Sequence, residues 1–536
     1  MSSLVMNNLL ILVLMPIFAG ISYYISGHVI ARRLCLVMPI LMLLYTIYLR
    51  TIGSFPIGML LLSETMPYGM ALRMDALSFS LILLNSVLFC MTTLYANHKP
   101  YFSKGFIFVF LSLEGLINGI FLSTDLFNLY VLIELSTVLV AILIMYKKEN
   151  RSIYDGLIYL MSNLVAMAFF LLGIGYCYKL FGVLDLDSLK IAIDNVKDPK
   201  VLILPFAFLM TGVSLKAAIM PLFSWLPRAH AAPSAPTIVS AILSGIFVKT
   251  GIYLLIRMQW LFGNQLDLMP LFLALGYTTA IIGFIFAMVQ KDIKLVLAYQ
   301  TISKMGLILI GLGYNTELSR LGAMYLILSH GLYKPLLFLI SGQLIEHYQT
   351  RQLSDMHSLW HISKKLSLIL IIAIFSITAA PLFSGSISKV LIGYSAPTLA
   401  MDLISIGTML SFVKFIGVIL PMPSSASSVS KSPIVIEKMQ WLSLFVLATL
   451  CVILGSLEGV ISNLVLFQSI PLLLKSDMLT KLMRYVIEFI VCLLIYKRVI
   501  SNNNWLDKLR KVDLSFNAMN IALVTYFAGI MLYLLV

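Results

Sequence analysis

The sequence predicts an all-α polytopic membrane protein. Of its 536 residues, 60% are hydrophobic and only 11% are charged, and the mean hydropathy of +1.00 lies well above that of a soluble domain. Apolar runs of roughly 20 residues, long enough for a helix to cross a hydrocarbon core, recur along almost the whole chain and give about 14 to 16 spans. No segment alternates with the two-residue period of a barrel strand, so we expect every span to be a helix.

The N-terminal part, residues 1–104, is expected to hold two or three helices and a lid on the outer face. The first span, near Leu9 to Ile25, lacks a charged segment before it and is followed by further apolar runs, so we interpret it as a retained helix and not a cleaved signal. Residues 51–75 are too interrupted by glycine, proline and charge to cross a bilayer. We expect a lid or a short hairpin there.

From Gly105 onward the expected spans follow one another closely, at 105–123, 126–146, 157–182, 201–220, 236–258, 268–290, 295–313, 321–344, 366–395 and 400–420. The serine-rich stretch "PSSASSVSKSP" at 423–433 is typical of a flexible loop. Three more spans are expected at 441–463, 483–499 and 517–536, with an interfacial helix in "NNNWLDKLRKVDL" between the last two. We therefore divide the remaining chain into 105–260, 265–421 and 422–536.

The charge distribution indicates topology. The net charge is +14, but the basic residues occupy short loops after alternate spans, at "ARR" (31–33), Lys99 with Lys104, "KKENR" (147–151), "KDIK" (291–294) and "KK" (364–365). Loops with this bias face the cytoplasm, which predicts a multi-pass protein of the cell inner membrane with its N-terminus outside. We expect no nucleic-acid partner.

Cofactor chemistry is not expected. The five cysteines are scattered singly in apolar context without a CxxC spacing, which favours buried structural thiols over a metal or iron–sulfur site. No Cys or His cluster could hold haem either. The sequence contains no redox or hydrolytic site that we can identify, so energy must come from a gradient or from partner subunits.

A short sequence repeat marks two interruptions of membrane helices. "PLFS" occurs at Pro221–Ser224 and at Pro381–Ser384, within about two turns of Lys216 and Lys389 respectively. Paired proline interruptions in two halves of a chain are typical of repeat-built transporters with discontinuous helices. Proline removes a helical hydrogen bond, and the carbonyls left behind are tolerated in a membrane only where protein or water can satisfy them. We expect a hydrated cavity near both breaks.

Among the ionisable residues inside expected spans, five are the primary candidates: Glu134, Lys216, Lys249, Lys334 and Lys389. A charge at the centre of a membrane helix costs about 2.5–3.5 kcal/mol on insertion scales, so each needs a partner or a function. One carboxylate cannot balance four lysines, which disfavours a purely structural set of ion pairs. A lysine in a low dielectric can be neutral and accept a proton. The pattern therefore predicts a proton relay in which Glu134 stabilises the charged form of a neighbouring lysine.

Other interpretations remain open for individual residues. Glu134 and Lys216 could be a structural ion pair that joins two helices. Lys249 and Lys389 could extend to an interface if the span limits shift by several residues. The depth of Lys334 is not settled because Pro335 follows it directly.

The secondary candidates are the two histidines, a second acidic residue and one more lysine. His230 and His330 have side chains suited to proton transfer, but a single histidine near a helix end can equally be a packed, hydrogen-bonded residue. Glu114 in "FLSLEGLING" is a further buried carboxylate. Asp125 and Asp75 stand at helix starts and are expected to be caps.

Five ordered motifs resemble the proton-translocating antiporter-like subunits shared by Mrp-type cation/proton antiporters, membrane-bound hydrogenases and respiratory complex I. They are "PLFSWLPRAHAAPSAPTIVSAILSGIFVKTGIYLLIR" (221–257), "STDLFNLYVLIELS" (123–136), "VQKDIKLVLAYQTISKMGLILIGLG" (289–313), "SHGLYKPLLFLISG" (329–342) and "APLFSGSISK" (380–389). The resemblance covers residues 70–420 and is nearest to Mrp D-type and hydrogenase-linked subunits. It implies a helical core with two inverted five-helix repeats, each with one broken helix.

The resemblance also implies roles for the buried charges. Glu134 and Lys216 would be the coupled pair, Lys249 the connecting lysine, and Lys334 and Lys389 the route to the far side. Lys304 in "TISKMG" stands where many members have His or Gln, which makes it a further relay candidate.

These expectations indicate a proton-conducting subunit of a multisubunit membrane complex. In one version of the hypothesis, protons are exchanged for sodium. Its partners would be other membrane subunits, the transported ions and the lipid bilayer. Two alternatives stay open: the proton-pumping membrane subunit of a redox complex such as a hydrogenase or quinone oxidoreductase, and a non-conducting scaffold.

Overall fold

The structure is a computed structural model that describes residues 9–52, 55–60, 71–231, 235–421, 433–469, 478–500, 506–510 and 515–535. The chain forms two compact units. Unit 1 comprises residues 1–239, 246–271 and 514–536, and unit 2 comprises residues 240–245 and 272–513.

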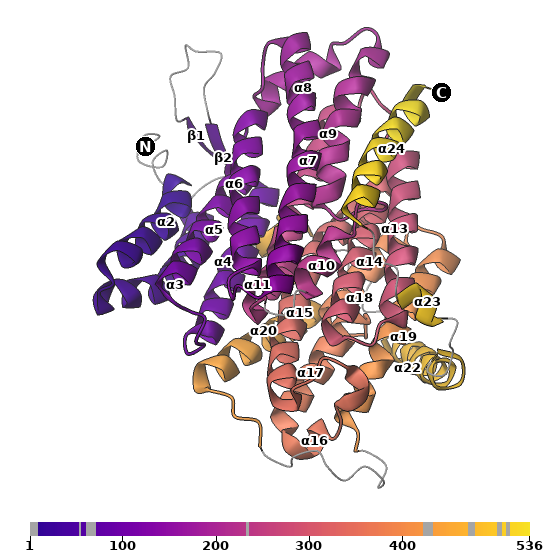
Figure 1. Cartoon of the computed structure of the whole chain (residues 1–536). Helices are drawn as coiled ribbons and strands as arrows, with labels where there is room; N and C mark the ends of the chain where they lie inside the picture. Colours follow the sequence, from indigo (N-terminus) through magenta and orange to yellow (C-terminus); the bar gives the residue numbers. More distant parts are fainter. Residues whose placement is uncertain are drawn as a thin grey trace. The chain divides into compact units, whose positions relative to one another are not determined.

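Unit 1 contains the N-terminal helices, the first broken span and the last helix of the chain (Figure 1). Its helices are α2 (Leu9–Ser26), α3 (Val29–Ile52), α4 (Ala76–Ala96), α5 (Lys104–Leu122), α6 (Leu126–Ile144), α7 (Asn150–Phe181), α8 (Leu186–Asp194), η1 (Pro199–Leu202), α9 (Ile203–Lys216), α10 (Trp225–Ala231), α12 (Val248–Phe262) and α24 (Phe516–Leu535). The span that contains α12 begins with α11 (Thr237–Ile242) and the π-helical turn η2 (Leu243–Phe247), which cross the division between the units.

Unit 2 contains the second broken span and the helices that follow it. Its elements are α13 (Met269–Val289), α14 (Ile293–Tyr314), α15 (Glu317–Tyr348), η3 (Leu353–Asp355), α16 (Leu359–Ile362), α17 (Lys364–Ile377), α18 (Ser384–Gly393), α19 (Thr398–Ile419), α20 (Lys438–Ser456), α21 (Glu458–Ile461), η4 (Ser462–Leu466), α22 (Met478–Ile495), η6 (Tyr496–Ile500) and α23 (Leu506–Arg510).

The expected hairpin between residues 51 and 75 is present in the described residues. Strand β1 (Ile57–Leu60) pairs antiparallel with β2 (Ala71–Met74), with Ile57 opposite Met74. Asp75 then caps α4, as expected, by accepting a hydrogen bond from the Ser78 amide at 2.8 Å. Its other carboxylate oxygen pairs with Arg257 of α12 at 2.6 Å, which joins the start of α4 to a second helix of unit 1.

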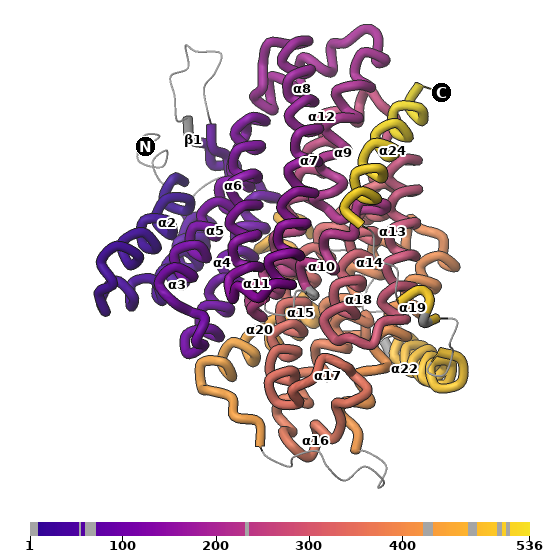
Figure 2. Tube along the Cα trace, viewed as in Figure 1, coloured from indigo at the N-terminus to yellow at the C-terminus, as the bar shows by residue number. Residues whose placement is uncertain are grey.

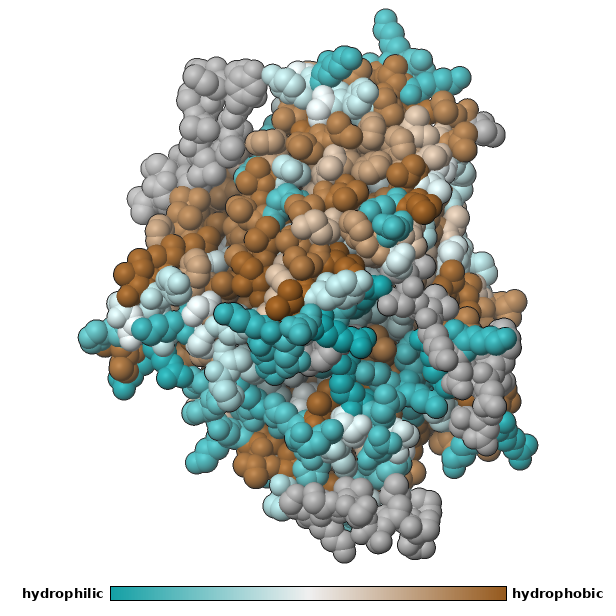
Figure 3. Space-filling model, in the orientation of Figure 1, coloured by the Kyte–Doolittle hydropathy of each residue, from teal (hydrophilic) through white to brown (hydrophobic). Residues whose placement is uncertain are grey.

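Within the described residues, 14 helices are long and apolar enough to cross a membrane. The shorter helices α17 and α18 together form a further, broken span. Large hydrophobic side chains on the outside of α6, including Phe127, Leu135 and Ile142, are exposed and suited to face lipid. Figure 3 shows hydrophobic side chains gathered over α2, α5 and α6. The predicted fold class, an all-α polytopic membrane protein, is confirmed.

Two segments of the chain repeat the same local structure 167 residues apart. Asp125 caps α6 and forms an isolated bridge with Asp185, while Asp292 caps α14 and forms one with Gln352. The long helices after them, α7 and α15, each contain 32 residues. This correspondence is the internal repeat that the "PLFS" pair indicated from the sequence.

Both "PLFS" motifs lie in helix breaks. In unit 1, α9 ends at Lys216 and α10 begins at Trp225, and in unit 2, α17 ends at Ile377 and α18 begins at Ser384. The two breaks contain residues with positive φ, Ala218 at 54° in the first and Ala379 at 61° in the second. The expectation that these two spans are discontinuous is confirmed.

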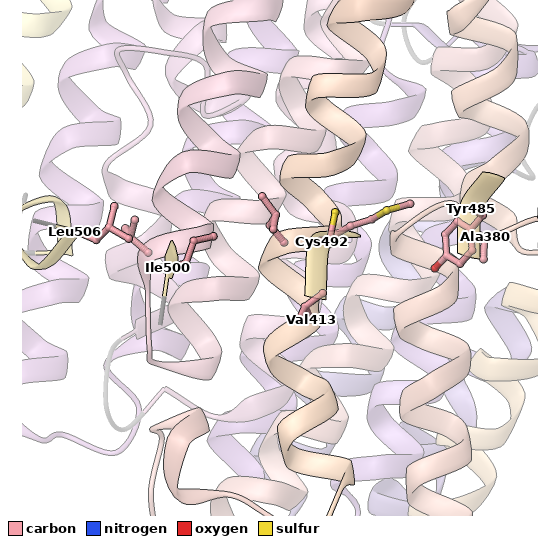
Figure 4. Packing of buried hydrophobic residues seen from close by; sticks show 9 residues of the cluster. Ala380, Val413, Tyr485, Cys492, Ile500 and Leu506 are labelled. Atoms are coloured by element: carbon pink, nitrogen blue, oxygen red, sulfur yellow. The ribbon is translucent and has the colours of Figure 1, made fainter. Parts of the chain in front are cut away.

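The C-terminal part differs from expectation at one element. The span expected at 483–499 corresponds to α22, which is not among the candidate spans. In Figure 4 the labelled residues Leu506, Ile500, Cys492 and Tyr485 follow one another in a row across the helices of unit 2. They pack with Val413 of α19 in a buried apolar cluster, so α22 lies against unit 2 along its length. Figure 2 shows α22 viewed along its axis while α17 is viewed from the side.

Two other expectations for this part fall on undescribed residues. The serine-rich loop at 423–433 lies almost wholly outside the described residues, and of the expected interfacial segment only residues 506–510, helix α23, are described.

Candidate functional site

Glu134 and Lys216 approach each other in unit 1 through a threonine. Glu134 lies in the middle of α6, and Thr137 lies one turn later on the same helix. Lys216, which is 1% exposed, is the last residue of α9, and its Nζ donates a hydrogen bond to Thr137 Oγ1. Glu134 Oε1 is buried and accepts no hydrogen bond. The carboxylate and the ammonium act on each other electrostatically.

Among the described ion pairs, none joins Glu134 to Lys216 within 4 Å. The expected pair is therefore brought together as neighbouring charges and not as a contact pair. Lys216 stands at the C-terminal end of α9, where the backbone carbonyls favour a positive charge. Its Nζ also lies 5.5 Å from the centroid of the Phe247 ring, a cation–π distance.

Lys249 lies close to the same break. It is fully buried, so the interpretation that it extends to an interface does not hold. Two residues further on, a Cβ atom at Gly251 would stand 2.3 Å from the Ala217 backbone nitrogen and 2.6 Å from the Lys216 carbonyl carbon. Only glycine permits this approach of α12 to the end of α9. The π-helical turn η2 precedes α12 directly, and such turns are frequent at functional sites.

In unit 2, Lys334 is fully buried within α15, which continues without interruption through Pro335. Its Nζ donates a hydrogen bond to the Leu297 carbonyl of α14 at 2.7 Å. The Thr301 hydroxyl donates to the same carbonyl and also contacts Ser244 Oγ at 2.8 Å. A line of polar groups therefore leads from Lys334 to residue 244, which precedes Lys249 by five positions in the chain.

Lys304 and Lys389 lie on either side of a small cavity in unit 2. Lys304 donates a hydrogen bond to Thr408 Oγ1 at 3.3 Å, and the two lysines repel each other electrostatically. The cavity between them has a volume of about 20 Å³, and a polar cavity of at least about 10–15 Å³ can hold a water. Tyr333, Thr378 and other polar side chains line it. A space large enough for a water therefore lies beside the second break.

Lys389 itself is only partly buried. It follows the break in unit 2, whereas Lys216 precedes the break in unit 1. It also lines a second cavity, of about 510 Å³. Lys389 thus lies beside a large cavity as well as the small one.

The secondary candidates are more scattered. His230 in α10 and His330 in α15 are fully buried, and His330 packs edge-on against Tyr333 with ring centroids 5.5 Å apart. Glu114 is fully buried in α5, and neither of its carboxylate oxygens accepts a hydrogen bond. The Asn85 side chain donates instead to the Glu114 backbone carbonyl at 3.3 Å.

Sequence reasoning missed Lys414, a further buried lysine of the repeated region. Its Nζ donates to the Gln290 carbonyl at 2.6 Å and to the Ala287 carbonyl at 3.2 Å, at the end of α13. The signal was present, because "FVK" occurs at 247–249 and again at 412–414, in corresponding spans of the two repeats. Its contacts with carbonyls at a helix end indicate a structural role.

The arrangement provides groups that can hold and exchange protons within each unit. Within the described residues, no group of three or more His, Cys, Asp or Glu side chains could hold a metal ion. Buried lysines lie beside hydroxyl or carbonyl acceptors in both units, and in unit 2 the small cavity beside Lys304 and Lys389 has room for a water. Stepwise proton transfer can use such groups.

Comparison with protein families decides the relationship. The model for the transmembrane part of NADH:quinone oxidoreductase and Mrp antiporter subunits matches residues 123–416. The chain belongs to this family. The matched region includes both broken spans, Glu134 and the buried lysines described above, and it ends before α22.

Individual relatives agree with the family. The chain is 30% identical over 398 residues to the D-type subunit of a Na⁺/H⁺ antiporter from Alkalihalophilus pseudofirmus, covering 72% of this chain and 80% of that protein. It is 34% identical over 338 residues to the putative antiporter subunit mnhD2 of Staphylococcus aureus, covering 61% of this chain and 66% of that protein.

Solved structures share the fold. A chain of the Mrp complex from Dietzia matches with a TM-score of 0.76 at 17% identity, over 95% of this chain and 100% of that one. A chain of the archaeal membrane-bound sulfane sulfur reductase matches with a TM-score of 0.76 at 21% identity, over 91% and 99%. A chain of respiratory complex I from Thermus thermophilus matches with a TM-score of 0.75 at 21% identity, over 88% and 99%.

Proposed function

We propose that this chain is the proton-conducting subunit of a multisubunit membrane complex that exchanges protons for sodium. The observation that carries the proposal is the burial of several lysines next to hydroxyl and carbonyl acceptors, with Glu134 as a neighbouring carboxylate to the first of them. Burying so many unbalanced positive charges is costly. The cost is avoided if the lysines lose and regain protons in turn.

In unit 1 the proposed step is a transfer controlled by Glu134. When Glu134 is ionised, it stabilises the ammonium form of Lys216. Displacement or protonation of Glu134 removes that stabilisation, so Lys216 releases its proton and becomes a neutral amine. Thr137 holds the Lys216 ammonium in place, because its hydroxyl donates to the Ile133 carbonyl and accepts from the Lys216 Nζ.

In unit 2 the proposed route uses Lys334, Lys304 and Lys389. Lys334 rests on a backbone carbonyl, and Lys304 faces the small cavity that also touches Lys389. Repulsion between the charges of Lys304 and Lys389 favours having one of them neutral at a time. A proton that arrives at one lysine therefore promotes release from the other. Lys249 is the residue we assign to the connection between the two groups.

The same proposal sets the place of the chain in the cell. The basic loops after alternate spans favour the cell inner membrane with the N-terminus outside. The proposed parts are 1–104 for the N-terminal helices, 105–260 and 265–421 for the two repeats, and 422–536 for the C-terminal helices. The proposed partners are other membrane subunits of the complex.

The test is proton-coupled transport in vesicles that contain the assembled complex. Glu134→Gln and Lys216→Ala should each abolish transport while the complex still assembles, and the loop variant Glu149→Gln is the control. Normal transport in both variants contradicts the proposal. Substituting Glu134→Leu and Lys216→Met together distinguishes the scaffold alternative, which requires transport to survive. If the proton flux does not change with sodium concentration, the exchange of protons for sodium is refuted and proton conduction alone remains proposed.

A further inference from the structure

A cavity of about 510 Å³ opens next to Lys389 in unit 2. The residues at the helix break, α18, the start of α19, the end of α20 and α22 contribute to its lining. Its walls are largely apolar side chains, but six charged residues line it: Lys389, Asp402, Glu458, Lys481, Arg484 and Glu488. Positive and negative charges are equal in number, so the cavity has no excess charge that would select a large anion or cation.

Helix α22 supplies the charged wall of this cavity. Arg484 Nη2 donates to the two carboxylate oxygens of Asp402 at 2.9 and 2.8 Å, and Arg484 Nε donates to Glu488 at 2.7 Å. One guanidinium therefore holds two carboxylates, one from α19 and one from α22. Although the Arg484 side chain is 63% exposed, these charge-assisted hydrogen bonds hold the two carboxylates near each other.

The same helix is attached to the second break. The hydroxyls of Tyr485 and Thr378 are hydrogen-bonded at 2.6 Å, and Thr378 is the first residue after α17. The buried cluster of Cys492, Ile500 and Leu506 with α19 fixes the rest of this segment (Figure 4). The position of Arg484 beside the break is thus set by α22 as a whole.

Lys389 lies between the two cavities of unit 2. It lines both the small cavity that reaches Lys304 and the large one that contains the two carboxylates. Glu488 and Asp402 attract the Lys389 ammonium electrostatically, and Arg484 repels it. Lys389 therefore shares the small cavity with Lys304 and the large cavity with the ionisable carboxylates of Asp402 and Glu488.

We propose that the large cavity is the aqueous opening of the proton path of unit 2, and that Asp402 and Glu488, held by Arg484, exchange protons between Lys389 and bulk water. This inference rests on the proposed function. It adds α22, which lies outside the family match, to the conducting part of the chain.

The step conserves the proton at each transfer. The Lys389 ammonium gives a proton, through water in the cavity, to a carboxylate of Glu488 or Asp402 and becomes a neutral amine. The carboxylic acid then loses the proton to bulk water and returns to the carboxylate. Transport in the other direction is the reverse sequence.

The topology indicates the side of the membrane on which the large cavity opens. Eleven of the candidate spans precede the second break, and the broken span α17–α18 is the next. An even number of crossings returns the chain to the side of the N-terminus, which we place outside. The cavity runs from the break along α18 to the start of α19 and the end of α20, and therefore opens outward.

Two sets of variants test the carboxylates in vesicles with the whole complex. Asp402→Asn combined with Glu488→Gln should lower the transport rate by about tenfold or more, because a positioned acid–base group accelerates proton transfer by at least that factor. Asp194→Asn is the matched control, since Asp194 is also in an ion pair and its side chain is 35% exposed like that of Asp402. It should transport at the normal rate.

A histidine variant separates proton exchange from ion pairing. Glu488→His, with Asp402→Asn, cannot pair with Arg484 as a carboxylate does, but it can carry a proton. If the carboxylates exchange protons, this variant recovers a large part of the rate that is lost in the Asp402→Asn/Glu488→Gln variant, the amide pair. If their only role is to attach α22, it remains as slow as the amide pair, and the proposal is overturned.

Thiol labelling tests the opening itself. Ser386 lines the cavity, so Ser386→Cys should react with a membrane-impermeant thiol reagent added outside and lose transport, while the unlabelled variant transports. No reaction from outside overturns the proposal. Normal transport in Asp402→Asn/Glu488→Gln with complete loss in Lys216→Ala would also overturn it and leave the proposed function intact. Normal transport in both Glu134→Gln and Lys216→Ala would refute the function itself.

Discussion

The Lys216 side chain is held by a hydroxyl and not by a carboxylate. A direct ion pair with Glu134 would bind the proton firmly, because separating two buried charges costs several kcal/mol. With Thr137 as the hydrogen-bond partner and Glu134 nearby, the Lys216 ammonium is stabilised without a direct ion pair. In the proposed mechanism, this arrangement lets small changes at Glu134 alter the proton affinity of Lys216.

Thr137→Val should therefore lower transport several-fold without abolishing it. Valine has nearly the same shape but leaves the Lys216 Nζ without this acceptor, so the lysine is held less precisely. The rate of proton uptake into vesicles measures the effect. Thr211→Val is the matched control because Thr211 is also buried in unit 1 but donates only to the Ala207 backbone carbonyl. Equal rates for the two variants would contradict the role given to Thr137.

Asp75 predicts a pH dependence of stability. Burial opposes its charged form, but the Arg257 guanidinium and the Ser78 amide outweigh burial and hold the pKa of Asp75 below its ordinary value. A carboxyl whose folded pKa is lowered stabilises the fold above its unfolded pKa, about 3.9, and this contribution is lost as the pH falls through the folded pKa. Asp75→Asn should have a lower Tm than the wild type at pH 7. In strong acid the difference in Tm between the two should become smaller. A Tm difference that stays constant with pH would contradict the ion pair.

At this scale the sequence identified most of the candidate residues but not their contacts. Glu134, Lys216 and Lys249 stand out because charged residues are rare in apolar runs. Thr137 could not be found in this way, since a threonine in a membrane helix usually bonds to its own backbone. Asp402 and Glu488 were missed because they meet only when α22 packs against α19, and no local pattern encodes that contact.

Among the elements, the broken spans are what the sequence predicts best. The proline-containing "PLFS" motifs mark the breaks, and the breaks in turn allow a second helix to approach the exposed backbone. At the first break that helix is α12, which passes the Lys216–Ala217 peptide at Gly251. The position of Lys249 relative to Lys216 depends on this contact.

Gly251→Ala should push α12 away from α9. The added Cβ would stand 2.3 Å from a backbone nitrogen, and backbone cannot rotate out of the way as a side chain can. Overpacking of this kind costs about 1–3 kcal/mol, so we expect a lower Tm together with slower transport. Gly175→Ala in α7 is the control, because nothing lies within 4 Å of its added Cβ. Its Tm should be unchanged or higher, since alanine favours a helix by about 1 kcal/mol over glycine. A Tm for Gly251→Ala that matches this control would contradict the close contact.

The element that sequence analysis described least well is α22. Its apolar composition predicts a span, but Lys481, Arg484 and Glu488 recur at intervals of three or four residues and place their charges on one side of the helix. That spacing, read as amphipathic, indicates a helix that lies against a surface. Its orientation depends on the tertiary contact with α19, which the sequence pattern does not specify.

For the molecule as a whole, the two units are interleaved along the chain. Unit 1 begins the sequence and also ends it, because α24 returns to pack on α9 and α7. The Tyr526 hydroxyl contacts Ser214 Oγ at 2.7 Å, and the Phe527 ring stacks on Phe208 with centroids 4.5 Å apart. The last helix therefore belongs to the structural core of the first part of the chain.

Ending the chain after residue 513 should destabilise unit 1. The truncation exposes the faces of α9 and α7 that α24 covers, and it removes the Tyr526–Ser214 hydrogen bond, which alone is worth about 1 kcal/mol. The expected result is a lower Tm of the purified complex and faster proteolysis between α7 and α9. Tyr526→Phe serves as the milder comparison and should lose only the hydrogen bond. A truncated chain with wild-type Tm would show that α24 is dispensable.

The return of α24 also sets an order for biosynthesis. Membrane helices enter the bilayer one after another as the ribosome makes them, so α9 is inserted long before its partner α24 exists. All of unit 2 must be synthesised and inserted in the interval, during which Ser214 and the aromatic rings of α9 face lipid or another protein. A ribosome that stalls anywhere in unit 2 thus leaves a first unit without the helix that completes its packing.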